Sequence, residues 1–187
     1  MKATRHRLHP LFGYELRGID IKRALSSEEI KFVSDAIAEG GILLLRGTGA
    51  DDDDLVRFAE NFGSIATFPM IREGSHQVLR ISNMDTEGNI LPPTHRSQQG
   101  HIANELWHTD SSYLRPRSTL TFLLSYVTPP TGANTEFCDM RVAYEQLSDA
   151  MRKRIEGLTG HHSILHSRKL TGFTDWSEKE REVLKGV

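Results

Sequence analysis

The sequence that decides the fold lies at residues 106–116 and reads Leu-Trp-His-Thr-Asp-Ser-Ser-Tyr-Leu-Arg-Pro. It follows a long polar stretch and opens the part of the chain richest in predicted strands. On an extended strand His108 and Asp110 project from the same face, because side chains two positions apart share a face. An imidazole nitrogen and a carboxylate oxygen side by side are two of the three ligands in the facial triad that binds non-haem Fe(II). The same spacing also fits a surface pair or a core histidine oriented by an aspartate, so by itself it leaves these alternatives open.

Short strands separated by turns are predicted on both sides of this sequence. The predicted strands are residues 13–21, Ile42–Leu45, Val78–Ile81, Ser118–Val127, Thr135–Met140 and Ser163–Leu165. They show no regular alternation with helices. This pattern indicates a mainly β fold with flanking helices (α+β), arranged as a sandwich or barrel.

Capping patterns mark where the helices are expected to begin. Ser26–Glu29 and Ser177–Glu180 each have the spacing of a capping box, in which a serine and a glutamate satisfy the first amides of a helix. Asp51–Asp54 could be taken for a metal site, but acidic residues also favour a helix N-terminus, and we expect a helix here that ends at Gly63. Arg141–Leu158 is predicted to be one helical stretch.

Length, charge and cysteine content limit the class of protein. The 187 residues fit a single domain, 1–187, and 37% hydrophobic residues are enough to build a core. The net charge of −2 argues against a nucleic-acid partner bound through a basic surface. No apolar run is long enough to span a membrane, and the N-terminal residues MKATRHRLHP lack the apolar core of a secretory signal. The lone Cys138 excludes an internal disulfide framework and favours the reducing cytoplasm.

Several separated motifs together resemble one enzyme family. They are LHPLF at 8–12, FAENFG at 58–63, LWHTDSSYLRP at 106–116, PPTGANTEFCDMRVAYEQL at 129–147 and SRKLTGFTDWSEKE at 167–180. In this order they resemble the Fe(II)- and α-ketoglutarate-dependent dioxygenases of the taurine/dichlorophenoxyacetate (TauD/TfdA) type. The similarity is greater to the dichlorophenoxyacetate branch, and it extends from about residue 8 to the end of the chain.

The resemblance implies a double-stranded β-helix (jelly roll) and a role for four residues. His108 and Asp110 match the first two iron ligands. Thr135 matches the threonine whose hydroxyl helps to hold an α-ketoglutarate carboxylate, and Asn104 matches an asparagine that lines the substrate side in the taurine enzyme. The implied cofactors are Fe(II), α-ketoglutarate as cosubstrate, and O2.

Two functional residues of the family have no match in the sequence. The second iron-binding histidine and the arginine that pairs with α-ketoglutarate are expected later than residue 187, so the jelly roll is expected to be C-terminally incomplete and the domain truncated before this distal region. His161, His162 and His166 could substitute as ligands. We favour instead a partly exposed strand or turn for these three histidines, because His162 and His166 would share a face only on a helix.

The resemblance further implies hydroxylation of a small organic acid, an aryloxyalkanoate of the dichlorophenoxyacetate kind, giving a phenol, glyoxylate, succinate and CO2. Three alternatives stay open: a taurine-type sulfonate dioxygenase, a catalytically incompetent fragment, and a cupin-like domain that binds metal or sugar. The oligomeric state is also open, a homo-oligomer included. Basic residues that precede the iron motif could supply a counter-charge for an anionic substrate, although each also fits ordinary solvated charge. They are Arg72, His76, Arg80, His95 and Arg96.

Overall fold

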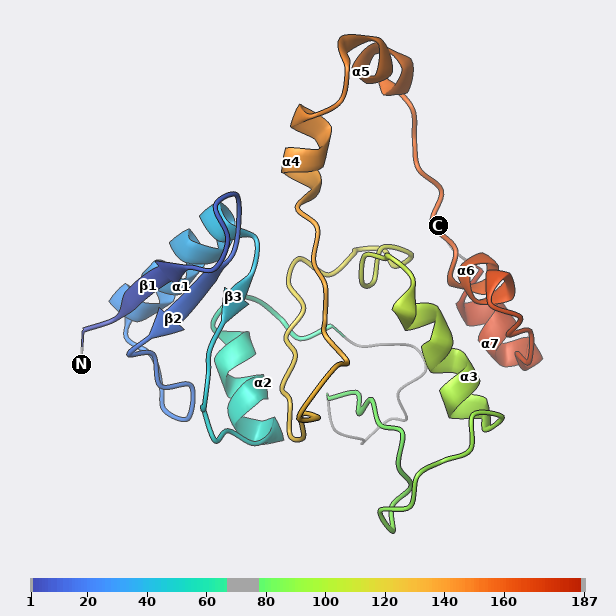
Figure 1. Ribbon diagram of the computed structural model, residues 1–187, viewed down its shortest axis with the longest axis horizontal. Coiled ribbons are helices and arrows are strands. Elements are labelled where there is room, and N and C mark those ends of the chain that lie inside the picture. Colours follow the sequence, from blue (N-terminus) through green and yellow to red (C-terminus); the bar gives the residue numbers. More distant parts are fainter. Residues whose placement is uncertain (1, 67–77, 186–187) are drawn as a thin grey trace. The chain divides into compact units, whose positions relative to one another are not determined.

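The computed structural model describes residues 2–66 and 78–185 and divides the chain into two compact units. Unit 1 combines Met1–Ile65 with Phe122–Leu158, and unit 2 combines Ala66–Thr121 with Thr159–Val187. Figure 1 labels the helices and strands of both units. That residues 1–187 form a single domain stays a prediction.

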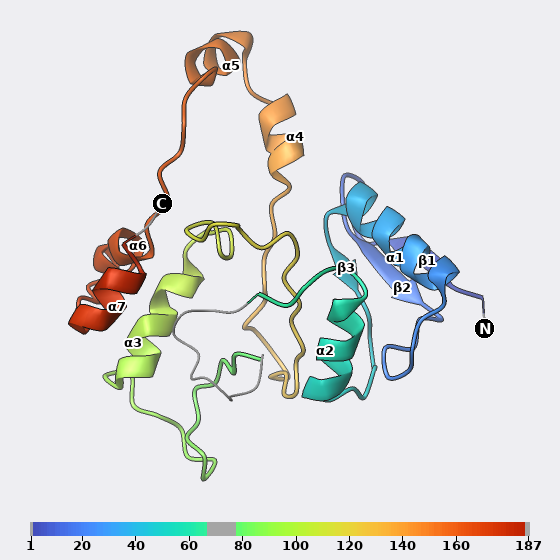
Figure 2. The same cartoon turned by 180° about the vertical axis from the view of Figure 1, so that it is seen from behind.

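A small mixed sheet organises unit 1. Strands β1 (Thr4–Arg7) and β2 (Tyr14–Arg17) pair antiparallel, and β2 pairs in parallel with β3 (Leu43–Leu44), which gives the order β1-β2-β3. The parallel connection between β2 and β3 contains helix α1 (Ser27–Gly40), which lies over one face of the sheet in Figures 1 and 2. The strands predicted within residues 13–21 and 42–45 are thus confirmed.

Both long helices of unit 1 begin with a capping box. At α1 the Ser26 hydroxyl accepts from the Glu29 amide at 3.2 Å, and the Glu29 carboxylate accepts from the Ser26 amide at 2.9 Å. Helix α2 (Asp52–Glu60) repeats this arrangement with Asp51 and Asp54. The aspartate run therefore satisfies the free amides at a helix start, as its position in the sequence predicts.

The core of unit 1 lies between the sheet and these two helices. Its buried members are Tyr14, Leu16, Ile21, Val33, Ala36 and Phe58. Phe122, from the second segment of the unit, packs against this core, and its ring centroid lies 6.0 Å from that of Phe58. Aromatic packing of this kind joins residues that are far apart in the sequence.

Arg141 ties the second segment of unit 1 to the end of α1. Asp139 caps helix α4 (Met140–Glu145), and its carboxylate accepts from the Arg141 amide at 2.8 Å and from the Arg141 guanidinium at 2.7 Å. The same guanidinium donates to the Ala38 carbonyl at 2.8 Å and to the Glu39 carbonyl at 3.2 Å. Arg141 therefore satisfies carbonyl groups that the last turn of a helix leaves without partners.

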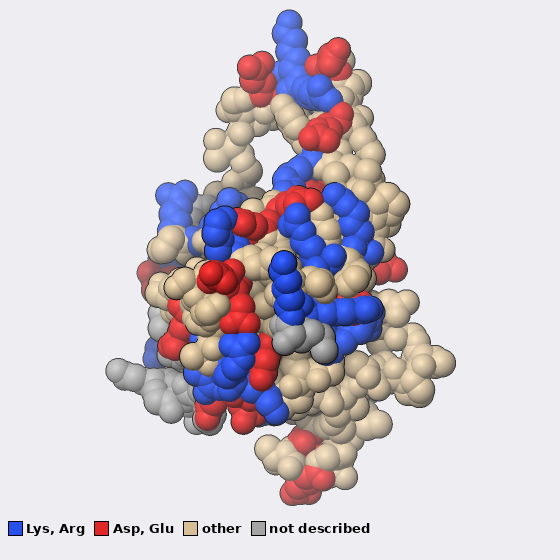
Figure 3. All heavy atoms as spheres, turned by 90° about the vertical axis from the view of Figure 1, so that its left-hand side faces the viewer, with Lys and Arg blue, Asp and Glu red and all other residues tan. Residues whose placement is uncertain are grey.

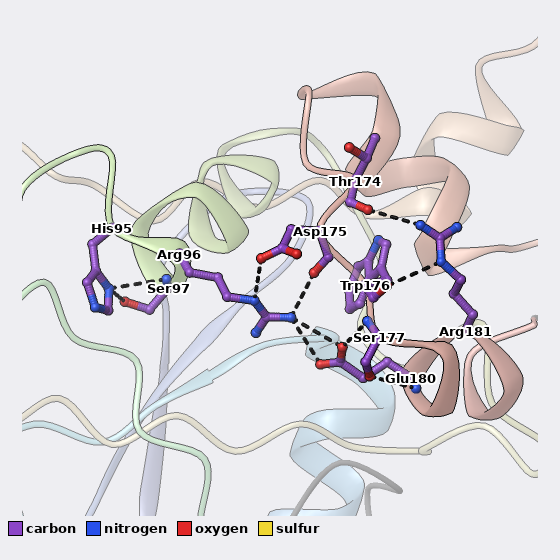
Figure 4. Close-up of polar contacts among 9 residues, drawn as sticks. All are labelled: His95, Arg96, Ser97, Thr174, Asp175, Trp176, Ser177, Glu180 and Arg181. Carbon is purple, nitrogen blue, oxygen red and sulfur yellow. Dashed lines mark hydrogen bonds and ion pairs between the residues drawn. The ribbon is translucent and has the colours of Figure 1, made fainter.

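Unit 2 contains α3 (Arg96–Ile102), the 3-10 turn η1 (Ala103–Glu105), α6 (Ile164–Leu170) and α7 (Glu178–Val183). Arg96 links α3 to the start of α7. Its guanidinium lies 3.1 Å from an Asp175 carboxylate oxygen and 3.1 Å from a Glu180 carboxylate oxygen, as Figure 4 shows. It also lies 5.5 Å from the ring centroid of the buried Phe173. The capping box predicted at Ser177 and Glu180 is confirmed.

Several predicted elements are wrong for the described residues. Residues 78–81, 118–127 and 135–140 form no strand there, and Met140 begins α4 instead. No second strand pairs with these residues, and a strand is stable only when its backbone hydrogen bonds are satisfied by a neighbour. Residues 163–165 begin α6 instead of a strand, since the Ser163 hydroxyl accepts from the His166 amide at 3.3 Å.

Two helix predictions also differ in detail, and one helix was not predicted. The predicted single helix at 141–158 is divided into α4 and α5 (Asp149–Ile155) by a new cap at Ser148. Helix α2 ends at Glu60 with Asn61 as its cap, before Gly63. The sequence pattern also missed α3. Helices account for more of the regular structure in the described residues than strands do, so the mainly β expectation is not met in this part of the chain.

The charged surface is mixed, as the sequence indicates. Basic and acidic side chains are interspersed on the face drawn in Figure 3, in keeping with the many ion pairs between them. Within the described part of the chain, no helix is both long and apolar enough to cross a membrane.

Replacing Arg141 by alanine should destabilise unit 1. The change leaves carbonyl groups of α1 and the Asp139 carboxylate without this partner, and because the side chain is half exposed we expect a loss of about 1 kcal/mol in unfolding free energy. Urea denaturation followed by circular dichroism measures it. Arg154→Ala, at an exposed arginine near the end of α5, is the matched control and should change stability by less than about 0.5 kcal/mol. Equal losses in both variants would contradict the capping role.

Glu29 should contribute to acid sensitivity. Hydrogen bonds from Arg23 and from Ser26 lower the pKa of Glu29 from 4.5 to about 2. A carboxyl group with a lowered folded-state pKa stabilises the fold above its unfolded pKa, and this contribution is lost as the pH falls from 4.5 toward 2. Glu29→Gln keeps a capping side chain, so it should lose less stability over that interval than the parent chain in a pH series of thermal melts. Glu28→Gln, an equal charge change in the same turn, should follow the parent.

Candidate metal site

The His108 side chain is held by a backbone carbonyl two residues earlier. Its Nδ1 lies 2.6 Å from the Leu106 carbonyl oxygen, and a carbonyl oxygen can only accept a hydrogen bond. In the neutral ring the proton is therefore on Nδ1, and Nε2 carries an available lone pair. Histidine ligands in metal sites commonly show this arrangement, in which the second nitrogen donates to a carbonyl or carboxylate.

The lone pair of His108 faces Asp110. Its Nε2 lies 3.3 Å from the Asp110 carboxylate oxygen, and the two side chains are 44% and 48% exposed. Two atoms that bind one metal at adjacent octahedral positions, each at about 2.1 Å, are about 3 Å apart. The residues thus fit a divalent metal. This exposure disfavours the core-histidine alternative, whereas a surface ion pair with protonated His108 fits the same distance.

Local backbone structure brings the pair together without a strand. Residues 107–109 are irregular and Asp110 begins a turn, so the extended strand on which the pair was considered is not formed, although the side chains do meet. The next residue, Ser111, is buried and has a φ of 56°, in the left-handed region that residues other than glycine rarely adopt. The Leu114 amide donates to the Ser111 carbonyl at 3.0 Å, which closes the turn. Positive φ angles in non-glycine residues often occur near functional sites.

The three later histidines do not complete a metal site. His162 contacts the Ser112 hydroxyl through Nδ1 at 2.9 Å, while His166 lies inside α6. Because His162 precedes the cap of α6, it does not share a helix face with His166. Residues 2–66 and 78–185 contain no group of three or more histidine, cysteine, aspartate or glutamate side chains that could hold a metal ion.

Asn104 and Thr135 occur in different units. Asn104 lies in η1 of unit 2, and its Oδ1 accepts from the Arg168 guanidinium at 2.8 Å. Thr135 is exposed in unit 1, a few residues before the cap of α4. Their roles toward substrate and α-ketoglutarate stay predictions.

The structure describes three of the five basic residues considered as counter-charges, since Arg72 and His76 lie outside the described residues. Arg80 is exposed, and His95 contacts the Ser97 hydroxyl through Nδ1 at 2.7 Å. The charge of Arg96 is balanced by Asp175 and Glu180, so its contacts are those of a residue that stabilises the fold (Figure 4).

Arg168 is a further candidate site residue, which the sequence motifs did not indicate. It lies in α6, is half-buried and contacts Asn104, and its burial lowers the pKa of its guanidinium. No local pattern distinguishes Arg168 from the other arginines, because its burial depends on tertiary packing.

Comparison with known proteins identifies the family. The family described as taurine catabolism dioxygenase TauD, TfdA matches residues 4–185, and the chain belongs to this family. An α-ketoglutarate-dependent 2,4-dichlorophenoxyacetate dioxygenase from Cupriavidus pinatubonensis is 35% identical over 193 residues, which cover 100% of this chain and 67% of that protein.

Solved structures agree with this assignment. The crystal structure of AAD-2 in complex with Mn(II) and N-oxalylglycine matches with a TM-score of 0.88 at 32% identity, over 100% of this chain and 65% of that one. A taurine dioxygenase from Burkholderia xenovorans matches with a TM-score of 0.59 at 20% identity, over 86% and 53% of the two chains, which bears on the fold alone. The chain thus spans about two thirds of the length of the 2,4-dichlorophenoxyacetate dioxygenase and of AAD-2.

The turn at Ser111 gives a prediction about the site backbone. Ser111→Gly should be tolerated, because glycine adopts a φ of 56° without steric cost, whereas Ser111→Val should destabilise the turn by about 1–2 kcal/mol or more. Thermal melts of both variants measure the difference. A valine variant as stable as the glycine variant would contradict the positive φ at this position.

Proposed function

We propose that this chain contains the first part of the active site of an Fe(II)- and α-ketoglutarate-dependent dioxygenase that hydroxylates a small organic acid. The observation that carries the proposal is the approach of His108 Nε2 to the Asp110 carboxylate, with Nδ1 of the same ring engaged by a carbonyl. Membership of the TauD/TfdA family supports the same chemistry.

Each candidate residue has a distinct role in this proposal. His108 and Asp110 hold Fe(II) through one nitrogen and one oxygen, and the Leu106 carbonyl keeps the histidine ring oriented. The Thr135 hydroxyl donates to a carboxylate of α-ketoglutarate, and Asn104 lines the substrate side. When bound, Fe(II) together with α-ketoglutarate and O2 supplies oxidation of a substrate carbon coupled to formation of succinate and CO2.

An aryloxyalkanoate is the substrate class that we propose. Hydroxylation of the carbon beside the ether oxygen gives a hemiacetal, which separates into a phenol and glyoxylate. The 35% identity to a 2,4-dichlorophenoxyacetate dioxygenase over the whole chain supports this class over a sulfonate, since the taurine dioxygenase match has 20% identity.

We also propose that unit 1 and unit 2 belong to a double-stranded β-helix (jelly roll). The TM-score of 0.88 to AAD-2 over the whole chain supports it. A location in the cytoplasm remains a prediction that depends on the lone Cys138.

A second candidate function is metal binding without turnover. It is favoured by the lack, among the described residues, of a third histidine or carboxylate beside His108 and Asp110. The two candidates differ in one observable: both bind Fe(II), but only the dioxygenase forms succinate from α-ketoglutarate.

Removing either ligand should weaken Fe(II) binding strongly. His108→Ala and Asp110→Ala each leave a single protein ligand, so anaerobic calorimetry should show an affinity about 100-fold or more below that of the parent chain. His6→Ala, at an exposed histidine of β1, is the matched control and should bind as the parent does. Unchanged binding in both site variants would remove His108 and Asp110 from the site.

Measurements of succinate formation then distinguish an aryloxyalkanoate substrate from a sulfonate. With Fe(II), α-ketoglutarate and O2, succinate formation should increase with phenoxyacetate and not with taurine. The opposite preference would overturn the aryloxyalkanoate assignment, and Fe(II) binding with no succinate from either substrate would favour the non-catalytic alternative.

A further inference from the structure

Arg168 is a half-buried cation whose only side-chain hydrogen bond to a described residue is to a neutral amide. Its Nη2 donates to Asn104 Oδ1 at 2.8 Å, and among residues 2–66 and 78–185 no carboxylate lies within ion-pair distance of it. The guanidinium has five N–H donors, so most of them are not used in side-chain contacts within the described chain. Burying a charge without a counter-charge is costly, and such groups are usually paired.

Two further residues that interact electrostatically with Arg168, His101 and Tyr113, are uncharged. Burial and the Arg168 charge lower the pKa of His101, which favours its neutral form, and burial raises the pKa of Tyr113, which keeps its hydroxyl protonated. Arg168 in α6 is therefore the positive charge of a group whose other members are His101 in α3, Asn104 in η1 and Tyr113 in the turn after Asp110.

Tyr113 links this group electrostatically to Asp110 of the candidate metal site. The Asp110 charge contributes to the raised pKa of Tyr113, and the Arg168 charge acts on Tyr113 in the opposite direction, so Tyr113 lies within electrostatic range of both. Asn104, the partner of Arg168, precedes His108 by four residues. An anion held by Arg168 would thus lie near the metal ligands of the same unit.

We propose that Arg168 binds the carboxylate of a small organic acid beside His108 and Asp110, with Asn104 fixing the orientation of the guanidinium. The planar fork of an arginine matches the two oxygens of a carboxylate in a bidentate contact, and charge-assisted hydrogen bonds of this kind are about twice as strong as neutral ones. The inference rests on the proposed function, because it places the acid beside the proposed iron ligands. Two acids have the required chemistry: an aryloxyacetate substrate and α-ketoglutarate.

Binding measured without metal and without turnover tests this proposal. Calorimetry with the 187-residue chain uses phenoxyacetate, its neutral analogue phenoxyethanol, and α-ketoglutarate as separate probes. We expect phenoxyacetate or α-ketoglutarate to bind, and Arg168→Gln to weaken that acid by about 10- to 100-fold, with little effect on phenoxyethanol. The acid that is weakened identifies which carboxylate Arg168 holds.

Two further variants distinguish the shape of the Arg168 guanidinium from a general loss of positive charge. Arg168→Lys keeps the charge and loses the fork, so it should retain part of the affinity and lie between the parent and Arg168→Gln. Lys179→Gln, an equal loss of charge at an exposed position in α7, should bind as the parent does. Circular dichroism melts confirm that each variant is folded.

The outcomes are distinct from those that test the proposed function. If neither acid binds the parent chain, or if Arg168→Gln binds both acids as tightly as the parent, the inference about Arg168 is overturned while Fe(II) binding by His108 and Asp110 can still hold. If Arg168→Gln weakens an acid but His108→Ala and Asp110→Ala still bind Fe(II) normally, the carboxylate site stands and the proposed iron site fails.

Discussion

The hydrogen bond from His108 Nδ1 to the Leu106 carbonyl is the constraint on which the candidate site depends. It fixes the neutral ring so that Nε2, at 3.3 Å from the Asp110 carboxylate, is the atom available to a metal. If the ring carried its proton on Nε2 instead, the nitrogen would donate to Asp110 and the pair would be a simple surface contact. Ser111, the residue after Asp110, has a strained backbone with a positive φ, and it turns the chain immediately after the second proposed ligand.

Much of the sequence that resembles the family serves the fold rather than the chemistry. Asp139 and Arg141, within the motif at 129–147, cap α4 and the last turn of α1. Ser177 and Glu180 begin α7, and Glu180 also pairs with Arg96 (Figure 4). The residues proposed to contact iron and its partners are few, and the motifs around them contribute contacts that stabilise each unit separately.

The sequence predicted correctly those elements that are determined by interactions between residues close together in the chain, such as the starts of helices. The capping box at Ser26 and the aspartates at 51–54 were sufficient to place α1 and α2, because a helix start is satisfied within a few residues. The strand at 118–127 was wrong because strand formation requires a second, distant strand, which propensity does not supply. Ser163 was misinterpreted for a related reason: its cap competed with an apolar pattern that also suits a strand. The approach of the His108 and Asp110 side chains was predictable from their spacing, whereas the burial of Arg168 was not, since it arises from tertiary packing.

Titration of Mn(II) into the chain with isotope-labelled histidine rings, followed by nuclear magnetic resonance, tests the central claim most directly. A paramagnetic ion bound between His108 and Asp110 broadens the His108 ring signals at low metal ratios, before those of the other histidines. We predict this order of broadening. If another histidine broadens first while the His108 signals stay sharp, His108 and Asp110 do not form the metal site.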